Sequence, residues 1–294
     1  MRLPRIKISP LESTAVYHCI SRTVNGERLF ADTEREEFRK QMWRIAEYCG
    51  VEIITYAVMA NHFHILVHVP QIAAVSDAEL LRRYRVLYPK PTKYQVAKIE
   101  VLEKKLTADG DDTDIKRWRS QQLALMGDIS QFMKLLKQRF SIWFNKTHKR
   151  FGTLWSERFK SVLVENGSAL RMMAAYIDLN PIRAGLATDP KDYRYCGYAE
   201  AVAGHKKLRA SLSAAFEQTD WKTAHNHYRQ VLFGSGGKQK NNLASLSAAQ
   251  VAKVLAEQGS LSAAELLRCK VKYFTNGAVM GGRAFVGKQL RRYR

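Results

Sequence analysis

A short segment with three histidines, residues 61–69, places the strongest constraint on how this chain can fold. It reads Asn-His-Phe-His-Ile-Leu-Val-His-Val, so polar and apolar side chains alternate over most of its length. Alternation with a period of two predicts a β-strand that has one face in a core. His62 and His64 then lie on the same face, roughly 6–7 Å apart at about 3.3 Å per residue. Two imidazoles at this spacing can bind one divalent cation. The alternative is that they are polar residues on a solvated sheet face.

The segments around this strand predict an α+β fold. Residues 15–22 are typical of a strand and are followed by an Asn-Gly turn signal at 25–26. Helical spacing of apolar residues predicts a helix over 32–49, and residues 51–58 predict a second strand before the histidine strand. The order β-α-β-β opens a ferredoxin-like sandwich, in which helices pack on an antiparallel sheet.

The middle of the chain predicts further helices and a fourth strand. Residues 77–128 predict a helical insertion that is interrupted by prolines and by an acidic run, and residues 129–145 predict a helix with an apolar stripe. A strand is expected at 161–165. A helix is expected from 168 to 179, ending before Pro181 because a residue that precedes proline avoids the helical region.

Three units are expected along the chain. Their ranges are 1–200 for the sandwich with its insertion, 201–235 for a helical extension, and 236–294 for a small basic unit. A Gly/Ser-rich linker separates the last two. The C-terminal unit is expected to be mainly helical, with two short helices at 247–257 and 263–272.

Positive charge dominates the composition. Lys and Arg number 48 against 27 Asp and Glu, which gives a formal net charge of +21 at pH 7. Residues 134–160 contain eight Lys/Arg and one acid, and residues 236–294 contain eleven and two. Such stretches favour a polyanionic partner, and a nucleic-acid backbone is the obvious one. The sequence has no apolar run of 18 residues, so a membrane partner is not expected.

The cysteines and the N-terminal residues bear on the compartment. Four widely separated cysteines, without a Cys-x-x-Cys pair, argue against a zinc ribbon and against a disulfide framework. The first residues, Met-Arg-Leu-Pro-Arg, lack the apolar core of a signal peptide. A cytoplasmic, reducing location is therefore expected.

A candidate nucleophile lies on the helix before Pro181. Tyr176 and Asn180 are four residues apart and share one helical face, while the core stripe occupies another. A tyrosine hydroxyl presented toward a cation site has the parts needed to attack a phosphodiester. The alternatives are that Tyr176 is an ordinary tyrosine at the edge of the core and that Asn180 caps a short helix beginning at Pro181.

A basic and aromatic loop around residues 148–160 is the candidate DNA contact. Bases can stack on aromatic faces while cations follow the phosphate backbone. The residues singled out in and next to this loop are Lys146, Lys149, Arg150, Trp155, Arg158 and Lys160. For Trp155, packing in the core is an equal alternative. Arg22 and Arg183 are further candidates, although lone arginines usually lie on a solvated surface.

Four blocks of the sequence, in this order and spacing, resemble one known family. They are Tyr17-His18-Cys19-Ile20-Ser21-Arg22, Met59-Ala60-Asn61-His62-Phe63-His64, Gly152-Thr153-Leu154-Trp155 through Arg158-Phe159-Lys160-Ser161, and Tyr176-Ile177-Asp178-Leu179-Asn180-Pro181-Ile182-Arg183-Ala184-Gly185. Over roughly residues 5–200 the chain is similar to the REP-associated tyrosine transposases. These are single-tyrosine HUH nucleases, where H is histidine and U a hydrophobic residue.

The resemblance implies a ferredoxin-like domain that cleaves single-stranded DNA at or near palindromic repeats that fold into hairpins. His62 and His64 match the family's metal-binding pair, Tyr176 matches its nucleophile, and Asn180 matches the polar residue that completes the metal site. The implied ion is Mg²⁺ or Mn²⁺, and the implied intermediate is a 5′-phosphotyrosine with a free 3′-hydroxyl. Such a protein is expected to be cytoplasmic and nucleoid-associated, as a monomer or a homodimer.

Two other functions stay open on the sequence. A non-catalytic nucleic-acid-binding regulator could share the scaffold, although the intact set of His62, His64 and Tyr176 argues against it. A zinc hydrolase that uses the two histidines is disfavoured, because no Asp, Glu or Cys ligand lies at a recognisable spacing.

Overall fold

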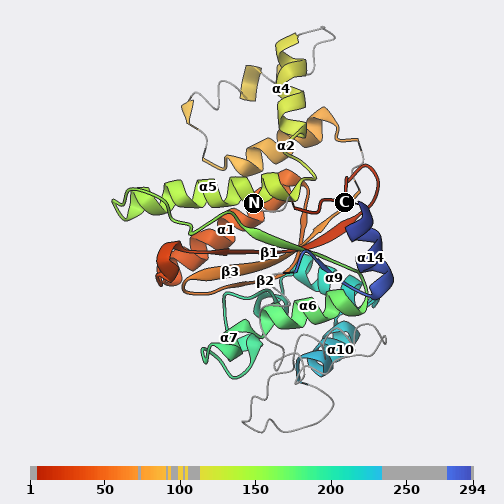
Figure 1. Ribbon diagram of the computed structural model, residues 1–294. Coiled ribbons are helices and arrows are strands. Elements are labelled where there is room, and N and C mark those ends of the chain that lie inside the picture. The colour runs from red at the N-terminus through yellow and green to blue at the C-terminus, as the bar shows by residue number, and fades with distance from the viewer. Residues whose placement is uncertain are drawn as a thin grey trace.

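A sheet with helices on both faces forms the centre of the protein (Figure 1). The structure, a computed structural model, describes residues 5–71, 74–90, 92–93, 99–101, 103–104, 113–233 and 277–292. Its strands are β1 (Ala15–Arg22), β2 (Glu52–Val58), β3 (His62–Val69), β4 (Lys160–Val164) and β5 (Val279–Met280). They lie in the order β2-β3-β1-β4-β5, with β5 parallel to β4 and all other neighbours antiparallel. The predicted ferredoxin-like sandwich is thus confirmed for β1 to β4. The sheet as a whole is mixed rather than antiparallel, because β5 adds a parallel edge.

Two groups of helices cover the two faces. Above the sheet in Figure 1 lie α1 (Asp32–Cys49) and α5 (Ile129–Thr147), with α2 (Asp77–Leu87) and α4 (Thr113–Leu123) of the predicted insertion above them. The opposite side carries α6 (Ser168–Asp178), α7 (Asn180–Arg183), α8 (Gly197–Val202), α9 (Lys206–Ala215) and α10 (Trp221–Phe233). The remaining elements are the 3-10 helices η1 (Val24–Gly26) and η2 (Pro190–Asp192) and helix α14 (Arg283–Arg292).

The expected elements at 15–69 and 129–179 agree with the structure to within about two residues at their ends. Of the helical insertion predicted at 77–128, the structure describes α2 and α4, while residues 91, 94–98, 102 and 105–112 lie outside the described residues. The helices expected at 247–257 and 263–272 lie outside the described residues. The boundaries of the three predicted units stay predictions, while β5 and α14, from the last of them, pack on the main sheet. None of the described helices is both long and apolar enough to cross a membrane.

An aromatic cluster between the sheet and the upper helices fixes the register of β3. Phe63 lies 4.5 Å from Phe38 of α1, measured between ring centroids, and Phe38 lies 5.2 Å from Phe140 of α5. All three rings are fully buried, and burial of each contributes about 1.5–3 kcal/mol to stability. A slip of β3 by one residue would turn Phe63 to the other face. The core therefore holds His62 and His64 on the face of the sheet that α6 covers.

The buried carboxylate of Asp178 joins the end of α6 to three other elements. Its Oδ1 accepts hydrogen bonds from Thr55 Oγ1 of β2 at 2.7 Å and from the backbone N–H of Tyr198 in α8 at 3.3 Å. Its Oδ2 accepts from the hydroxyl of Tyr228 in α10. Burial raises the pKa of Asp178 to about 7, against the smaller opposing effect of these donors. These bonds hold α6, and with it Tyr176, against the sheet.

Candidate active site

Strands β1 and β3 place histidines and an arginine on the sheet face that α6 covers. In the β1–β3 register, Arg22 lies opposite His62 and Ile20 lies opposite His64, and residues opposite each other share a face. His18, two residues before Ile20, lies on the same face. The ring centroids of His62 and His64 are 5.1 Å apart, as are those of His18 and His64.

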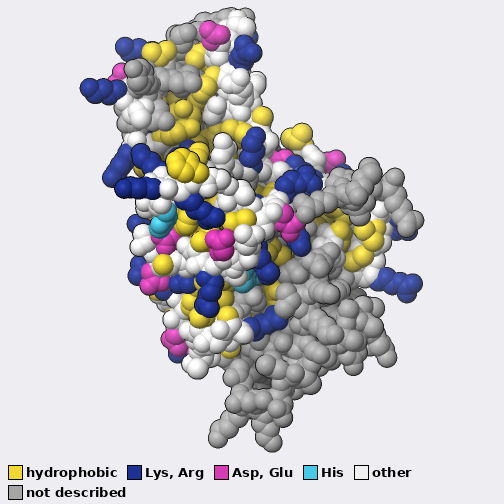
Figure 2. All heavy atoms as spheres, turned by 60° about the vertical axis from the view of Figure 1, so that its left-hand side comes forward, with side chains coloured by type: hydrophobic (Ala, Val, Ile, Leu, Met, Phe, Trp, Pro, Cys, Tyr) yellow, Lys and Arg dark blue, Asp and Glu magenta, His cyan; other side chains and the backbone are white. Residues whose placement is uncertain are grey.

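These elements line a pocket of about 500 Å³. It brings together eight of the residues that the sequence singled out: Arg22, His62, His64, Arg158, Lys160, Tyr176, Asn180 and Arg183. Glu157 also lines it and pairs with Lys160 at 3.4 Å. The face of the molecule turned forward in Figure 2 carries more Lys and Arg than Asp and Glu side chains. Among the described residues, four cations and one acid line the pocket itself, so the lining favours an anionic ligand.

Helix α6 presents Tyr176 to the histidines. The centroid of its ring lies 5.8 Å from that of His64, edge to face, and 6.0 Å from that of His18. Burial raises the pKa of the Tyr176 hydroxyl, while the positive charges of Arg183 and Arg22 act in the opposite direction. The guanidinium carbon of Arg183 lies 5.3 Å from the centre of the tyrosine ring. The phenol thus lies beside the candidate cation site, with Arg183 over its ring.

Each of the paired histidines has one ring nitrogen bound within the protein. His62 Nδ1 lies 2.7 Å from Asn61 Oδ1, and Asn61 Nδ2 donates to the carbonyl of Gly26 at 3.0 Å, which fixes the orientation of the amide. An amide oxygen only accepts, so His62 carries its proton on Nδ1 and has a lone pair on Nε2. His64 Nδ1 lies 2.9 Å from His18 Nε2, which leaves Nε2 of His64 as the nitrogen for a ligand.

Both histidines are neutral at pH 7. Burial, with a smaller effect of Arg22, lowers the pKa of His62 to about 4. Burial lowers the pKa of His64 well below its ordinary value, and the neighbouring His18 and His62 add to the effect. Neutral imidazole is the form that binds metal ions.

Asn180 has a second role that the sequence did not indicate. Its Nδ2 donates to the carbonyls of Tyr176 at 2.9 Å and Ile177 at 3.2 Å, in the last turn of α6. Helix α7 begins at Asn180 itself, and its N-cap residue is Leu179, so the alternative of Asn180 as an N-cap is wrong. Its side-chain oxygen is the polar atom that these bonds leave for the pocket.

The donor set at the pocket fits a weakly held divalent cation. Within the described ranges, no three His, Cys, Asp or Glu side chains form a group that could hold a metal ion. The pocket offers instead two neutral imidazoles, from His62 and His64, and one amide oxygen, from Asn180. This mixed set suits an ion that takes its remaining ligands from water or phosphate oxygens.

In the loop between α5 and β4, Trp155 packs in the core instead of facing solvent. Trp155 is 9% exposed, its Nε1 donates to Ser141 Oγ at 2.8 Å, and its ring lies 5.5 Å from that of Phe63 between centroids. Core packing is therefore the alternative that the structure supports, and Trp155 is not placed for stacking on a base. Phe151 is 94% exposed.

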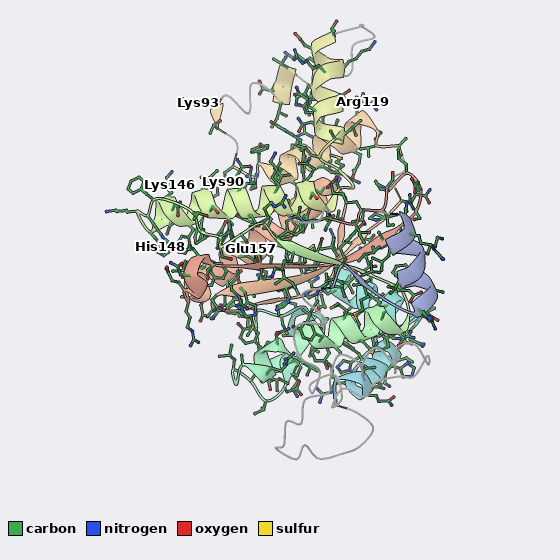
Figure 3. All side chains as sticks on the ribbon, viewed as in Figure 1. Lys90, Lys93, Arg119, Lys146, His148 and Glu157 are labelled. Carbon is green, nitrogen blue, oxygen red and sulfur yellow. The ribbon has the colours of Figure 1, made fainter. Side chains whose placement is uncertain are left out.

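Three of the predicted DNA-contact cations do not line the pocket. Lys146, on α5, and Lys149 are exposed to solvent, and Arg150 pairs with Glu27 at 3.7 Å. In Figure 3, Lys146 lies on α5 and Glu157 lies closer to the strands. These cations could meet DNA only outside the pocket.

Comparisons with known proteins agree with the sequence resemblance. Residues 12–80 match the model of a family described as IS200-like transposases, a segment that includes His18, His62 and His64 but not Tyr176. One similar solved structure is a REP-associated tyrosine transposase bound to a REP hairpin, with 15% identity and a TM-score of 0.39 over 69% of this chain and 85% of that chain. No curated protein matches the chain. Over residues 12–80 the chain carries the sequence pattern of the IS200-like transposase family, which agrees with the sequence resemblance to the tyrosine transposases.

Proposed function

We propose that this protein is a metal-dependent endonuclease and strand transferase that acts on single-stranded DNA at or near hairpin-forming repeats. The observation that carries the proposal is the meeting of Tyr176 with His62 and His64 in one cation-lined pocket. The match of residues 12–80 to IS200-like transposases supports the reaction class. Hairpin specificity and the choice of Mg²⁺ or Mn²⁺ follow from the sequence resemblance. A cytoplasmic location and a monomeric or homodimeric state stay predictions.

The charges in the pocket suit a phosphodiester as the substrate. Arg22, Arg158, Lys160 and Arg183 line it, and Glu157 is the acid beside them. Cations around a phosphate position the strand without reading its bases. Contacts that distinguish one DNA sequence from another would then lie outside the pocket.

The reaction begins at the Tyr176 hydroxyl. Its oxygen attacks the phosphorus, the bond from phosphorus to the 3′ oxygen breaks, the phenol loses its proton and the 3′ oxygen gains one. The product is a 5′-phosphotyrosine that keeps one phosphodiester bond, so a 3′-hydroxyl can reverse the step and join strands. Arg183 and Arg22 stabilise the negative charge on the phenol oxygen and the phosphate. A divalent ion held by His62, His64 and Asn180 would neutralise a non-bridging phosphate oxygen.

Replacing the nucleophile tests the proposal. The wild-type protein, incubated with Mg²⁺ or Mn²⁺ and a fluorescent hairpin oligonucleotide with single-stranded flanks, is expected to form an SDS-resistant adduct. Tyr176→Phe should form none while it binds the hairpin as tightly, and His62→Ala should lose the metal-dependent activity. Tyr195→Phe, outside the pocket, is the matched control and should cleave normally. Cleavage by Tyr176→Phe at the wild-type rate would refute the nucleophile.

Hairpin binding by the wild-type protein without any adduct would favour the second candidate. That candidate is a non-catalytic nucleic-acid-binding regulator on the same scaffold. It is kept because the side chain of Tyr176, at 2% exposure, is nearly closed to solvent.

A further inference from the structure

We propose that His18 is a positioning residue that holds His64 in the tautomer with a bare Nε2, the form that can bind a cation. The proposal rests on the His62–His64 cation site of the proposed function. Within that function it assigns a role to a residue that lies outside the pocket.

The geometry sets His18 against only one nitrogen of His64. His18 is fully buried on β1, at the centre of the sheet, and its Nε2 lies 2.9 Å from His64 Nδ1. Its ring is nearly parallel to that of His64, with 18° between the planes. His64 is 3% exposed, so water has little access to this pair. The contact is therefore a hydrogen bond within the core.

One proton occupies this hydrogen bond, and the nitrogen that carries it determines whether His64 can bind a cation. If His64 carries it on Nδ1, His18 Nε2 accepts, and Nε2 of His64 keeps its lone pair. If His18 donates instead, neutral His64 must carry its proton on Nε2, where a cation would bind. Only the first arrangement is compatible with a metal site, and it requires an acceptor at the place of His18 Nε2.

Asn61 provides an internal comparison. Its amide oxygen accepts from Nδ1 of His62, the neighbouring histidine on the same strand face. The two metal-ligand candidates thus share one pattern, in which Nδ1 is bound inside the protein and Nε2 is left over. Because an amide oxygen does this for His62, an amide oxygen is also expected to replace His18.

Two simpler roles for His18 predict different results. A third metal ligand would have to reach the pocket, but His18 does not line it and its Nε2 faces His64. A residue that only fills space would be replaceable by Phe, which has a ring of similar shape and no acceptor. The positioning role instead predicts that Gln, whose side-chain oxygen can accept near the same place, works better than Phe.

The experiment measures Mn²⁺ affinity by electron paramagnetic resonance on the full chain. A Tyr176→Phe background, with saturating hairpin oligonucleotide, prevents cleavage during the titration. His18→Phe is expected to weaken Mn²⁺ binding about 10–100-fold, the usual loss for a partner of a metal ligand, and His18→Gln should recover most of it. His225→Phe is the matched control, since His225 also bonds another side chain, Tyr198, but lies outside the pocket.

A second measurement reads the tautomer without metal or DNA. Long-range ¹H–¹⁵N correlation spectra of histidine-labelled wild-type protein should show His64 protonated on Nδ1. The same spectra of His18→Phe should show protonation on Nε2 or a mixture. This measurement decides the proposal even if His18→Phe does not fold.

Three results would overturn the proposal. They are a wild-type His64 protonated on Nε2, wild-type Mn²⁺ affinity in His18→Phe, and a folded His18→Gln as weak as His18→Phe. If no variant bound Mn²⁺, not even the Tyr176→Phe protein with His18 intact, the metal site of the proposed function would be contradicted instead. The tautomer of His64 would still decide the role of His18.

Discussion

Tyr176 combines two opposing influences on its hydroxyl. Burial between α6 and the sheet disfavours the phenolate, whereas the positive charges of Arg183 and Arg22 favour it. A nucleophile that must lose its proton is helped by the positive charges. Burial strengthens the effect of these charges, because charges interact more strongly away from water. Under the proposed function, we therefore expect the two arginines to act on the phenol as well as on the phosphate.

Replacing Arg183 should make this balance visible. Arg183→Gln removes the larger favourable charge, so the pKa of Tyr176 should rise further and less phenolate is present at a given pH. We expect the cleavage rate at pH 7 to fall about ten- to hundredfold and its rise with pH to move to higher pH. The measurement is the pH–rate profile of hairpin cleavage at saturating DNA.

A control for that change exists elsewhere on the surface. Arg194 lies 5.7 Å from the ring centre of Tyr195, much as Arg183 lies over Tyr176, but neither residue lines the pocket. Arg194→Gln should therefore keep the wild-type profile. An unchanged pH midpoint in Arg183→Gln would show that Arg183 does not act on the nucleophile.

The site residues that could be predicted from the sequence are those to which the proposed function gives a direct chemical role. Strand alternation put His62 and His64 on one face, and the helix spacing put Tyr176 near Asn180. His18 acts through His64, and that contact depends on the β1–β3 register, which no local pattern gives. The same holds for Trp155, whose burial follows from aromatic partners on α5 and β3 rather than from its own loop.

At the scale of elements, Asp178 makes the position of α6 depend on β2, α8 and α10. Its pKa is raised to about 7 in the folded protein, from an ordinary value of 3.8. The folded state then binds the proton more tightly than the unfolded state. The contribution of this group to stability is complete below pH 3.8 and is lost as the pH rises through 7.

Urea unfolding between pH 4 and pH 7.5 tests this linkage. The wild-type free energy of unfolding should fall by about 2–4 kcal/mol more over this range than that of Asp178→Asn. The groups that face Asp178 do not titrate there, because burial raises the pKa of Tyr198 to about 12 and holds those of Tyr228 and Cys196 well above their ordinary values.

A second aspartate should show the opposite sign. Arg229 holds the pKa of Asp189 below its ordinary value despite partial burial, so Asp189→Asn should cost more stability at pH 7 than at pH 3. Parallel curves for the wild type and Asp178→Asn would contradict the assignment of a raised pKa to Asp178.

Most elements could be predicted because they are long enough for the periodic pattern of apolar residues to repeat. Helices α1 and α5 and strands β1 to β3 each span seven or more residues. Strand β5 has two residues and no period, and it exists because the backbone of residues 278–280 pairs with β4. The sequence thus predicted the antiparallel part of the sheet and missed its parallel edge.

At the scale of the whole molecule, a segment near residue 280 pairs with strand β4, which lies more than a hundred residues earlier in the chain. Leu163 N–H donates to Ala278 O at 3.0 Å and Glu165 N–H donates to Met280 O at 2.8 Å. The Glu165 carboxylate accepts from the backbone of Gly282 at 2.6 Å, and Arg292 pairs with Glu12. Residues 277–292 therefore cover the edge of β4.

Removing residues 277–294 should uncover that edge. Exposed strand edges pair with other chains, so the shortened protein is expected to show a larger mass than the full chain in size-exclusion chromatography with light scattering. Arg292→Ala, which keeps β5, should leave the mass unchanged. A shortened protein with the mass of the full chain would show that β4 needs no cover.

The pairing of β4 with β5 also has a consequence during biosynthesis. Leu163 leaves the ribosome long before Val279, its partner in the sheet. Until then the nascent chain carries a sandwich whose outer strand is open to neighbouring chains. Slow translation after α10 would lengthen this interval. During it, the open edge of β4 is the part of the nascent chain that a chaperone would shield.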